Sequence, residues 1–204
     1  VRYPESGFVH NMLGVVINQQ DRETEAVGAY EQAIQVDSGY ADPYNNLGLI
    51  NKKQGNQQEA LKRFKQAVEA DPEYGEARNN LGVTLQELDQ HELALEHLEK
   101  AAKISPNVGF VHFNYAKSLR IQGDLDGALR EYNVAIRLKT DYFEAYNNRG
   151  NVLEDLRRYD DAKDSYTRAT QFNPNNSLAF SNLGLVEKKL GDYQGAFRNF
   201  AKAL

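Results

Sequence analysis

The sequence repeats itself every 34 residues, and this period restricts the fold more than any other feature. Six related hexapeptides begin at positions that differ by multiples of 34: HNMLGV at His10, YNNLGL at Tyr44, RNNLGV at Arg78, HFNYAK at His112, YNNRGN at Tyr146 and FSNLGL at Phe180. Periods of 20–50 residues are typical of arrays in which each repeat packs only against its neighbours. The chain is therefore expected to be a stack of similar units.

The register holds from one end of the chain to the other without an insertion or a deletion. Taking Gly7 as slot 1 of a 34-residue numbering, the units are 7–40, 41–74, 75–108, 109–142, 143–176 and a shorter 177–204. Residues 1–6 continue the register backwards and are interpreted as the tail of a preceding repeat. We treat 1–204 as a single solenoid domain.

Small and large side chains recur at fixed slots and predict a helical hairpin in each unit. Slots 20 and 27 are alanine in all six units, slot 8 is glycine or alanine, and slot 24 is always large and apolar. Slots 4, 7, 8 and 11 share one face of a first helix, and slots 20, 24, 27 and 28 share one face of a second. A turn is expected near slot 15, where Gly55, Gly123 and Gly191 lie, and proline at slot 32 (Pro72, Pro106, Pro174) should end the second helix.

This pattern resembles the tetratricopeptide repeat (TPR) family over the whole chain. The resemblance implies an all-α fold, a right-handed superhelical solenoid of antiparallel helix pairs, with the first helices lining a concave groove. Some positions depart from the family pattern. Slot 4 holds His10, Arg78 and His112 where a large apolar residue is preferred, Arg149 replaces leucine at slot 7, and Glu187 occupies slot 11.

Asparagine occupies slot 6 of the first helix in five consecutive units: Asn46, Asn80, Asn114, Asn148 and Asn182. Asparagine is a mediocre helix former, so local propensity does not explain the choice. An amide both donates and accepts, so a row of amides could hold the main chain of an extended peptide. The row resembles the asparagine ladder in the superhelix of O-linked N-acetylglucosamine transferase. The alternative is that these amides bond neighbouring helices.

Other groove-facing slots supply candidate anchors. Phe110 and Phe113 are candidates for an apolar pocket, or else for contacts between adjacent units. Lys117 and Asn151 are the polar candidates at slot 9. Slots 12 and 13 alternate in charge between units, which predicts a solvated edge with ion pairs between units, or a partner of matching charge.

Composition and motif searches exclude several other functions. The formal net charge of −5 argues against general nucleic-acid binding and against electrostatic attachment to membranes. The chain has no cysteine, its four histidines lack ligand spacing, and no phosphate-binding or metalloprotease motif is present. We therefore expect no catalytic residues, no metal and no cofactor.

Three functional hypotheses follow. The chain is a non-catalytic scaffold that binds a protein or peptide segment in its groove, or the substrate-recruiting arm of a larger enzyme such as a glycosyltransferase, or a module that associates end to end with itself. Both ends look cut within a repeat, and Phe197, Phe200 and Leu204 of the last helix are expected to be partly exposed. A cytoplasmic location is the working expectation.

Overall fold

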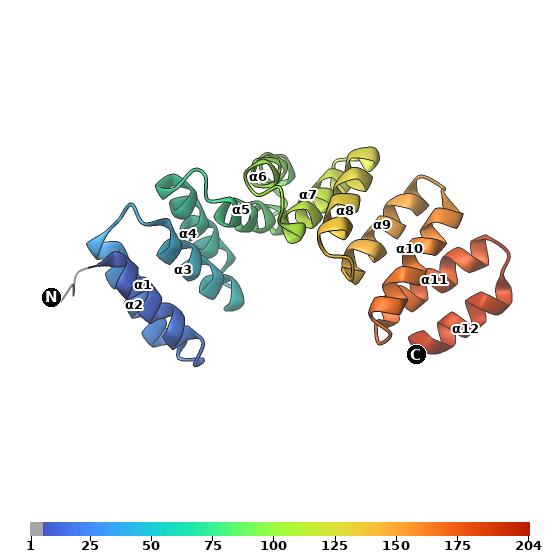
Figure 1. Ribbon diagram of the computed structural model, residues 1–204, viewed down its shortest axis with the longest axis horizontal. Helices are drawn as coiled ribbons and strands as arrows, with labels where there is room; N and C mark the ends of the chain where they lie inside the picture. Colours follow the sequence, from blue (N-terminus) through green and yellow to red (C-terminus); the bar gives the residue numbers. More distant parts are fainter. Residues whose placement is uncertain (1–5) are drawn as a thin grey trace. The chain divides into compact units, whose positions relative to one another are not determined.

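A computed structural model describes residues 6–204, which form twelve α-helices and no strand (Figure 1). The helices are α1 (Gly7–Asn18), α2 (Glu23–Val36), α3 (Ala41–Lys53), α4 (Gln57–Ala70), α5 (Gly75–Glu87), α6 (His91–Ile104), α7 (Gly109–Ile121), α8 (Leu125–Leu138), α9 (Phe143–Asp155), α10 (Tyr159–Phe172), α11 (Ser177–Lys189) and α12 (Tyr193–Ala203). Each 34-residue unit holds one odd-numbered first helix and one even-numbered second helix, as the period predicts. Apart from Ser6, the segment interpreted as the tail of a preceding repeat lies outside the described residues.

The turn inside each helix pair has the same backbone conformation in all six units. Slot 15 has a positive φ in every unit, between 58° and 83°. Glycine adopts this left-handed conformation without steric cost, and the sequence predicted a turn at Gly55, Gly123 and Gly191. The other three units place Asp21, Asp89 and Arg157 there, which the residue pattern did not indicate.

Within each pair, slot 24 of the second helix packs onto slot 8 of the first. A Cβ added to Gly48 would lie 2.5 Å from the Phe64 ring, and one added to Gly150 would lie 2.4 Å from the Tyr166 ring. Real Cβ contacts of this length do not occur, so the ring position in these two repeats requires glycine at slot 8, whereas the fourth repeat holds Ala116 there. All slot-20 and slot-27 alanines up to Ala196 are buried, and together with these rings they form the core.

The chain divides into two compact units, residues 1–105 and 106–204. In the first (unit 1), α2 packs on α3 and α4 on α5; in the second (unit 2), α8 packs on α9 and α10 on α11. Each unit is therefore a stack of antiparallel helix pairs, and each is described by itself. That residues 1–204 form one solenoid domain stays a prediction.

Polar residues at slot 4 are accommodated by one recurring hydrogen bond. The Tyr44 hydroxyl donates to the Ser38 carbonyl at 3.2 Å, and Arg78 Nε donates to the Pro72 carbonyl at 2.6 Å. In unit 2, His112 Nε2 lies 3.0 Å from the Pro106 carbonyl. In each case the carbonyl belongs to slot 32 of the preceding repeat. Slot 4 therefore admits histidine and arginine because it needs bulk and a donor, not a purely apolar side chain.

Candidate partner-binding surface

The slot-6 asparagines lie on the first helices α3, α5, α7, α9 and α11, and all five are half-buried. The slot-5 asparagines beside them (Asn11, Asn45, Asn79 and Asn147) are buried. One helix position thus separates a buried amide from a partly solvated one.

Three slot-6 amides bond the preceding repeat. Asn46 Nδ2 donates to Asn11 Oδ1 at 3.0 Å, and Asn80 Nδ2 donates to Asn45 Oδ1 at 2.9 Å. In unit 2, Asn182 Nδ2 donates to Asn147 Oδ1 at 2.9 Å. We call these contacts the amide bridges. They show that part of the hydrogen-bonding capacity of the asparagine row holds neighbouring first helices together.

Tyrosines at slot 34 extend the amide bridges in unit 1. Asn11 Nδ2 donates to the Tyr40 hydroxyl at 3.3 Å, Asn45 Nδ2 to the Tyr74 hydroxyl at 3.4 Å, and Tyr74 donates in turn to Asp42 Oδ1 at 3.2 Å. Burial and the nearby Asp42 carboxylate raise the pKa of Tyr74. The sequence analysis missed these tyrosines, although tyrosine at slot 34 of three units was a signal that could have found them.

In unit 2 an aromatic cluster replaces the amide at slot 5 of the fourth repeat. The half-buried Phe113 ring lies 4.9 Å from the Tyr142 ring and 5.9 Å from the Tyr132 ring, between centroids. Lys117 Nζ lies 5.9 Å from the centre of the Phe113 ring. Burial raises the pKa of Tyr142 to about 12. Phe113 thus packs against tyrosines of its own repeat (109–142), whereas Phe110 is 43% exposed.

Asn148 differs from the three bridging asparagines because the preceding repeat offers it Phe113 in place of an amide. Its Oδ1 accepts from Asn151 Nδ2 at 3.4 Å, and its own Nδ2 donates to no group within residues 6–204. Asn151 Oδ1 accepts from the Tyr166 hydroxyl at 2.8 Å. Of these two candidates, Asn148 has more hydrogen-bonding groups left for a partner, because Asn151 both donates and accepts within the chain.

The charged edge at slots 12 and 13 forms ion pairs between neighbouring repeats. Lys52 pairs with Glu87 at 2.9 Å in unit 1. Arg120 pairs with Asp155 at 2.8 Å, and Lys189 with Glu154 at 2.6 Å, in unit 2. The alternation of charge is therefore explained by these pairs, as one of the two sequence interpretations expected.

Apolar side chains also remain exposed at slots 2 and 9 of the first helices. Phe8 is 60% and Leu178 is 61% exposed, and Leu49 and Leu185 are exposed as well. On α12, Phe197 and Leu204 are exposed and Phe200 is half-buried. In the part of the chain that is described, no three metal-binding side chains cluster, and no helix combines the length and apolar character of a membrane span.

Comparison with known proteins identifies the repeat. Four family models match, all described as TPR or tetratricopeptide repeats, over residues 5–73, 45–108, 116–156 and 143–176. The chain belongs to the tetratricopeptide repeat family. Its all-α class of stacked antiparallel helix pairs is the one expected from the sequence. No curated protein matches the TPR chain at the sequence level.

Several solved structures share the fold at low sequence identity. YrrB, described as a TPR protein with an unusual peptide-binding site, is 24% identical with a TM-score of 0.73, over 92% of this chain and 94% of that one. The Pseudomonas aeruginosa protein pilF is 19% identical with a TM-score of 0.82, over 96% and 89%. A chain of the APC/C hetero-tetramer Cut9-Hcn1 is 16% identical with a TM-score of 0.80, over 100% of this chain and 40% of that one.

Proposed function

We propose that this TPR protein is a non-catalytic interaction scaffold whose first helices bind a peptide segment of a partner protein. One observation carries the proposal: the first helices present partly exposed asparagine amides beside exposed apolar side chains. Amides can hold a peptide main chain, and apolar side chains can anchor its residues.

The amide bridges leave groups available for a partner. Asn46 and Asn182 each spend one Nδ2 hydrogen in a bridge, and neither Oδ1 accepts a hydrogen bond within the described residues. Asn148 Nδ2 donates no hydrogen bond within the described residues. Each hydrogen bond to a peptide would contribute roughly 0.5–1.5 kcal/mol net, so several are needed for useful affinity.

The exposed apolar side chains supply the remaining affinity. Phe110 and Leu178 lie at slot 2 in unit 2, and Leu49 lies at slot 9 in unit 1. Burying 100 Å² of such surface contributes roughly 2.5 kcal/mol. Phe113 acts mainly as a support in this proposal, because Tyr132 and Tyr142 already contact its ring.

The described relatives favour the same class of function. YrrB is described with a peptide-binding site, and Cut9 was solved in complex with Hcn1. The recruiting arm of a larger enzyme would use the same surface, so it stays an alternative. End-to-end self-association would instead use the exposed Phe197. The formal charge of −5 favours a protein partner over nucleic acid or membrane, and a cytoplasmic location completes the proposal.

The test is capture of partners from a native lysate by the intact chain and by a Phe110→Ala/Asn148→Ala double variant. Neither residue makes an amide bridge, so folding should be retained and circular dichroism should not change. We expect recovery of bound proteins to fall at least fivefold, as for the loss of one or two interface contacts. The control carries Arg130→Ala and Thr140→Ala, two exposed residues outside the first helices. Equal recovery by both double variants would contradict the proposal that the first helices bind the partner.

A further inference from the structure

Arg149 lies where three other repeats bury a leucine. Slot 7 is Leu47, Leu81 and Leu183 in three other units, and all three are buried. Arg149 Nε donates to Ser165 Oγ at 3.1 Å, and Nη1 donates to Asn133 Oδ1 at 3.0 Å. These bonds hold a half-buried guanidinium between α8 and α10.

Arg149 forms no ion pair within 4.0 Å in residues 6–204, and the Asp161 and Asp164 carboxylates act on its charge only from a longer distance. A guanidinium has five N–H donors, and hydrogen bonds to two neutral oxygens leave most of them unused. Removing a cation from water without a close counter-charge is unfavourable. Burial lowers the pKa of Arg149, and this effect exceeds the opposite effect of the two carboxylates. An anion reaching this guanidinium would relieve the imbalance.

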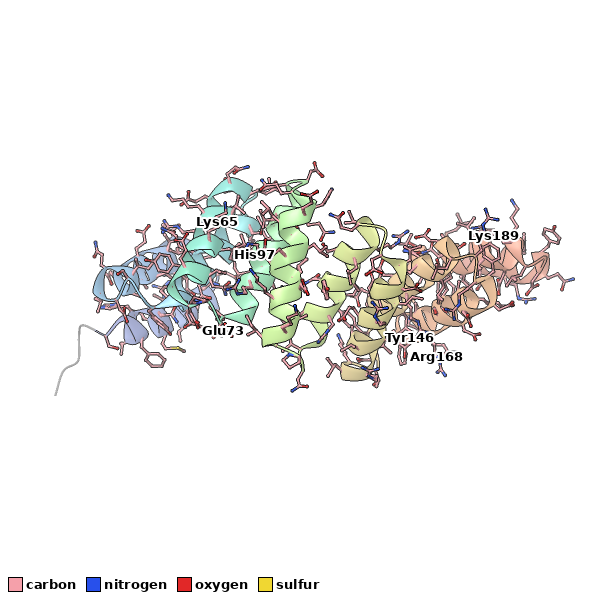
Figure 2. All side chains as sticks on the ribbon, turned by 90° about the horizontal axis from the view of Figure 1, so that it is seen from above. Lys65, Glu73, His97, Tyr146, Arg168 and Lys189 are labelled. Carbon is pink, nitrogen blue, oxygen red and sulfur yellow. The ribbon has the colours of Figure 1, made fainter. Side chains whose placement is uncertain are left out.

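Arg149 opens into a depression of about 550 Å³ on the α9–α10 hairpin. Its lining is Tyr146 and Arg149 from α9, and Asp164, Thr167, Arg168 and Gln171 from α10. Arg168 is exposed and, like Arg149, forms no ion pair within the described residues. Two guanidinium groups and one carboxylate give the depression a net positive charge. Figure 2 labels Tyr146 and Arg168 on this part of unit 2.

The floor of the depression is rigid. The Arg149 guanidinium carbon lies 5.3 Å from the centre of the Tyr146 ring. The other side of that stack is closed by Phe172, whose ring centroid is 5.5 Å from that of Tyr146. A fixed guanidinium loses little conformational entropy when it binds an anion.

The shape of the depression fits a chain segment better than a single ion. Its α10 wall runs from Asp164 to Gln171, seven positions that span roughly 10 Å at the helical rise. About three residues of an extended peptide cover that distance. Gln171 can hydrogen-bond the main chain of such a segment, because its amide both donates and accepts.

We propose that this depression binds an acidic segment of a partner protein, with an aspartate or glutamate carboxylate seated between Arg149 and Arg168. Arginine pairs carboxylates through two parallel hydrogen bonds, which suits the unused Arg149 donors. The site is separate from the slot-6 surface, since Tyr146 and Arg149 are three positions apart and share a face of α9 that Asn148 does not.

The test measures binding of an acetylated, amidated Glu–Gly–Glu–Gly–Glu peptide to the full chain by calorimetry at low salt. A peptide with glutamine in place of each glutamate is the ligand control. We expect Arg149→Leu to weaken binding about tenfold and Arg149→Lys to weaken it less, because lysine keeps the charge without the paired donors. Asp164→Asn should strengthen binding about threefold, since it removes a negative charge that repels the glutamates of the peptide.

Arg130→Leu is the control, because it removes an exposed positive charge from unit 2 outside the depression. Its affinity should stay within twofold of the unaltered chain, a change typical of an isolated surface charge. Arg149→Leu restores the residue found in four other repeats, so failure to fold is not expected, and a thermal melt checks it. Equal weakening by Arg130→Leu and Arg149→Leu, or equal binding of the glutamine peptide, would overturn the proposal.

Discussion

One repeat of unit 2 differs from those of unit 1, although both units follow the same 34-residue pattern. In unit 1, Asn11 and Asn45 accept from the next repeat and donate to tyrosines of their own repeat, so the junctions between first helices are polar. In unit 2, Asn147 likewise accepts from Asn182, but the fourth repeat holds Phe113 at slot 5, whose ring packs against two tyrosines of the same repeat. The same slot can therefore hold either an amide or a ring.

The difference has a consequence for binding. An amide bridge uses a donor of the slot-6 asparagine, as in Asn46 and Asn80. Where Phe113 stands in for the amide, Asn148 keeps both of its Nδ2 hydrogens. A phenylalanine at slot 5 thus leaves the slot-6 amide of the next repeat available to a partner, whereas an amide bridge uses part of that amide.

Removing the aromatic cluster should have the largest effect on stability. Phe113→Ala deletes ring contacts with Tyr132 and Tyr142 and leaves a partial cavity, so we expect a loss of about 3 kcal/mol in the free energy of unfolding. Urea unfolding followed by circular dichroism measures it. Phe110→Ala, on the more exposed neighbouring phenylalanine, is the control and should cost less than half as much. Equal losses would mean that the ring contacts of Phe113 do not stabilise the repeat.

Breaking an amide bridge should cost somewhat less. Asn45→Ala removes a buried amide that accepts from Asn80 and donates to Tyr74, and we expect a loss of about 2 kcal/mol. Asn148→Ala, at a half-buried asparagine with no bridge, should change stability by about 0.5 kcal/mol or less. The same urea experiment compares them, and a similar loss for both variants would show that the bridges add nothing.

Restoring leucine at slot 7 should stabilise unit 2. Arg149→Leu replaces a half-buried, unpaired cation by the residue that packs at Leu47 and Leu81, and we expect a gain of about 1–2 kcal/mol. A rise in the urea midpoint would report it, with Arg130→Leu as the control expected to have little effect. A loss of stability would mean that the Arg149 hydrogen bonds outweigh the cost of its burial.

The left-handed turns offer a smaller test in both units. Arg157→Gly removes the steric cost of a positive φ and should stabilise the chain by about 1 kcal/mol, less the extra entropy of glycine. Gly123→Ala, the same slot one repeat earlier, should destabilise by a similar amount. Thermal melts of the two variants should shift in opposite directions. Shifts of the same sign would contradict the shared turn geometry.

The charged edge should contribute least. Lys52→Ala removes the ion pair with Glu87, and we expect a loss of about 0.5 kcal/mol at low salt that vanishes near 1 M salt. Lys188→Ala is the control, because that exposed lysine forms no ion pair within the described residues. Identical salt dependence of the two variants would show that the ion pairs of the charged edge do not stabilise the fold.

Much of the fold could be predicted because it depends on short-range periodicity. Glycine at slot 8 and a ring at slot 24 contact each other within one hairpin, so the sequence spacing predicted their contact. The positive φ of Arg157 could not be predicted, because arginine carries no preference for that conformation and the neighbouring helices impose it. Peptide binding by the candidate asparagines stays a prediction, although the structure assigns part of their capacity to amide bridges.

The sequence by itself determined the number of repeats, the helix pairs and the residues of each core, because these follow from side-chain size at a constant spacing. Only the tertiary structure decided which amides are used internally. The residue 35 positions earlier is Asn11 for Asn46, which bonds it, and Phe113 for Asn148, which instead bonds Asn151 within its own helix. It also decided that Arg149 is unpaired, because an ion pair depends on distances that no spacing rule specifies.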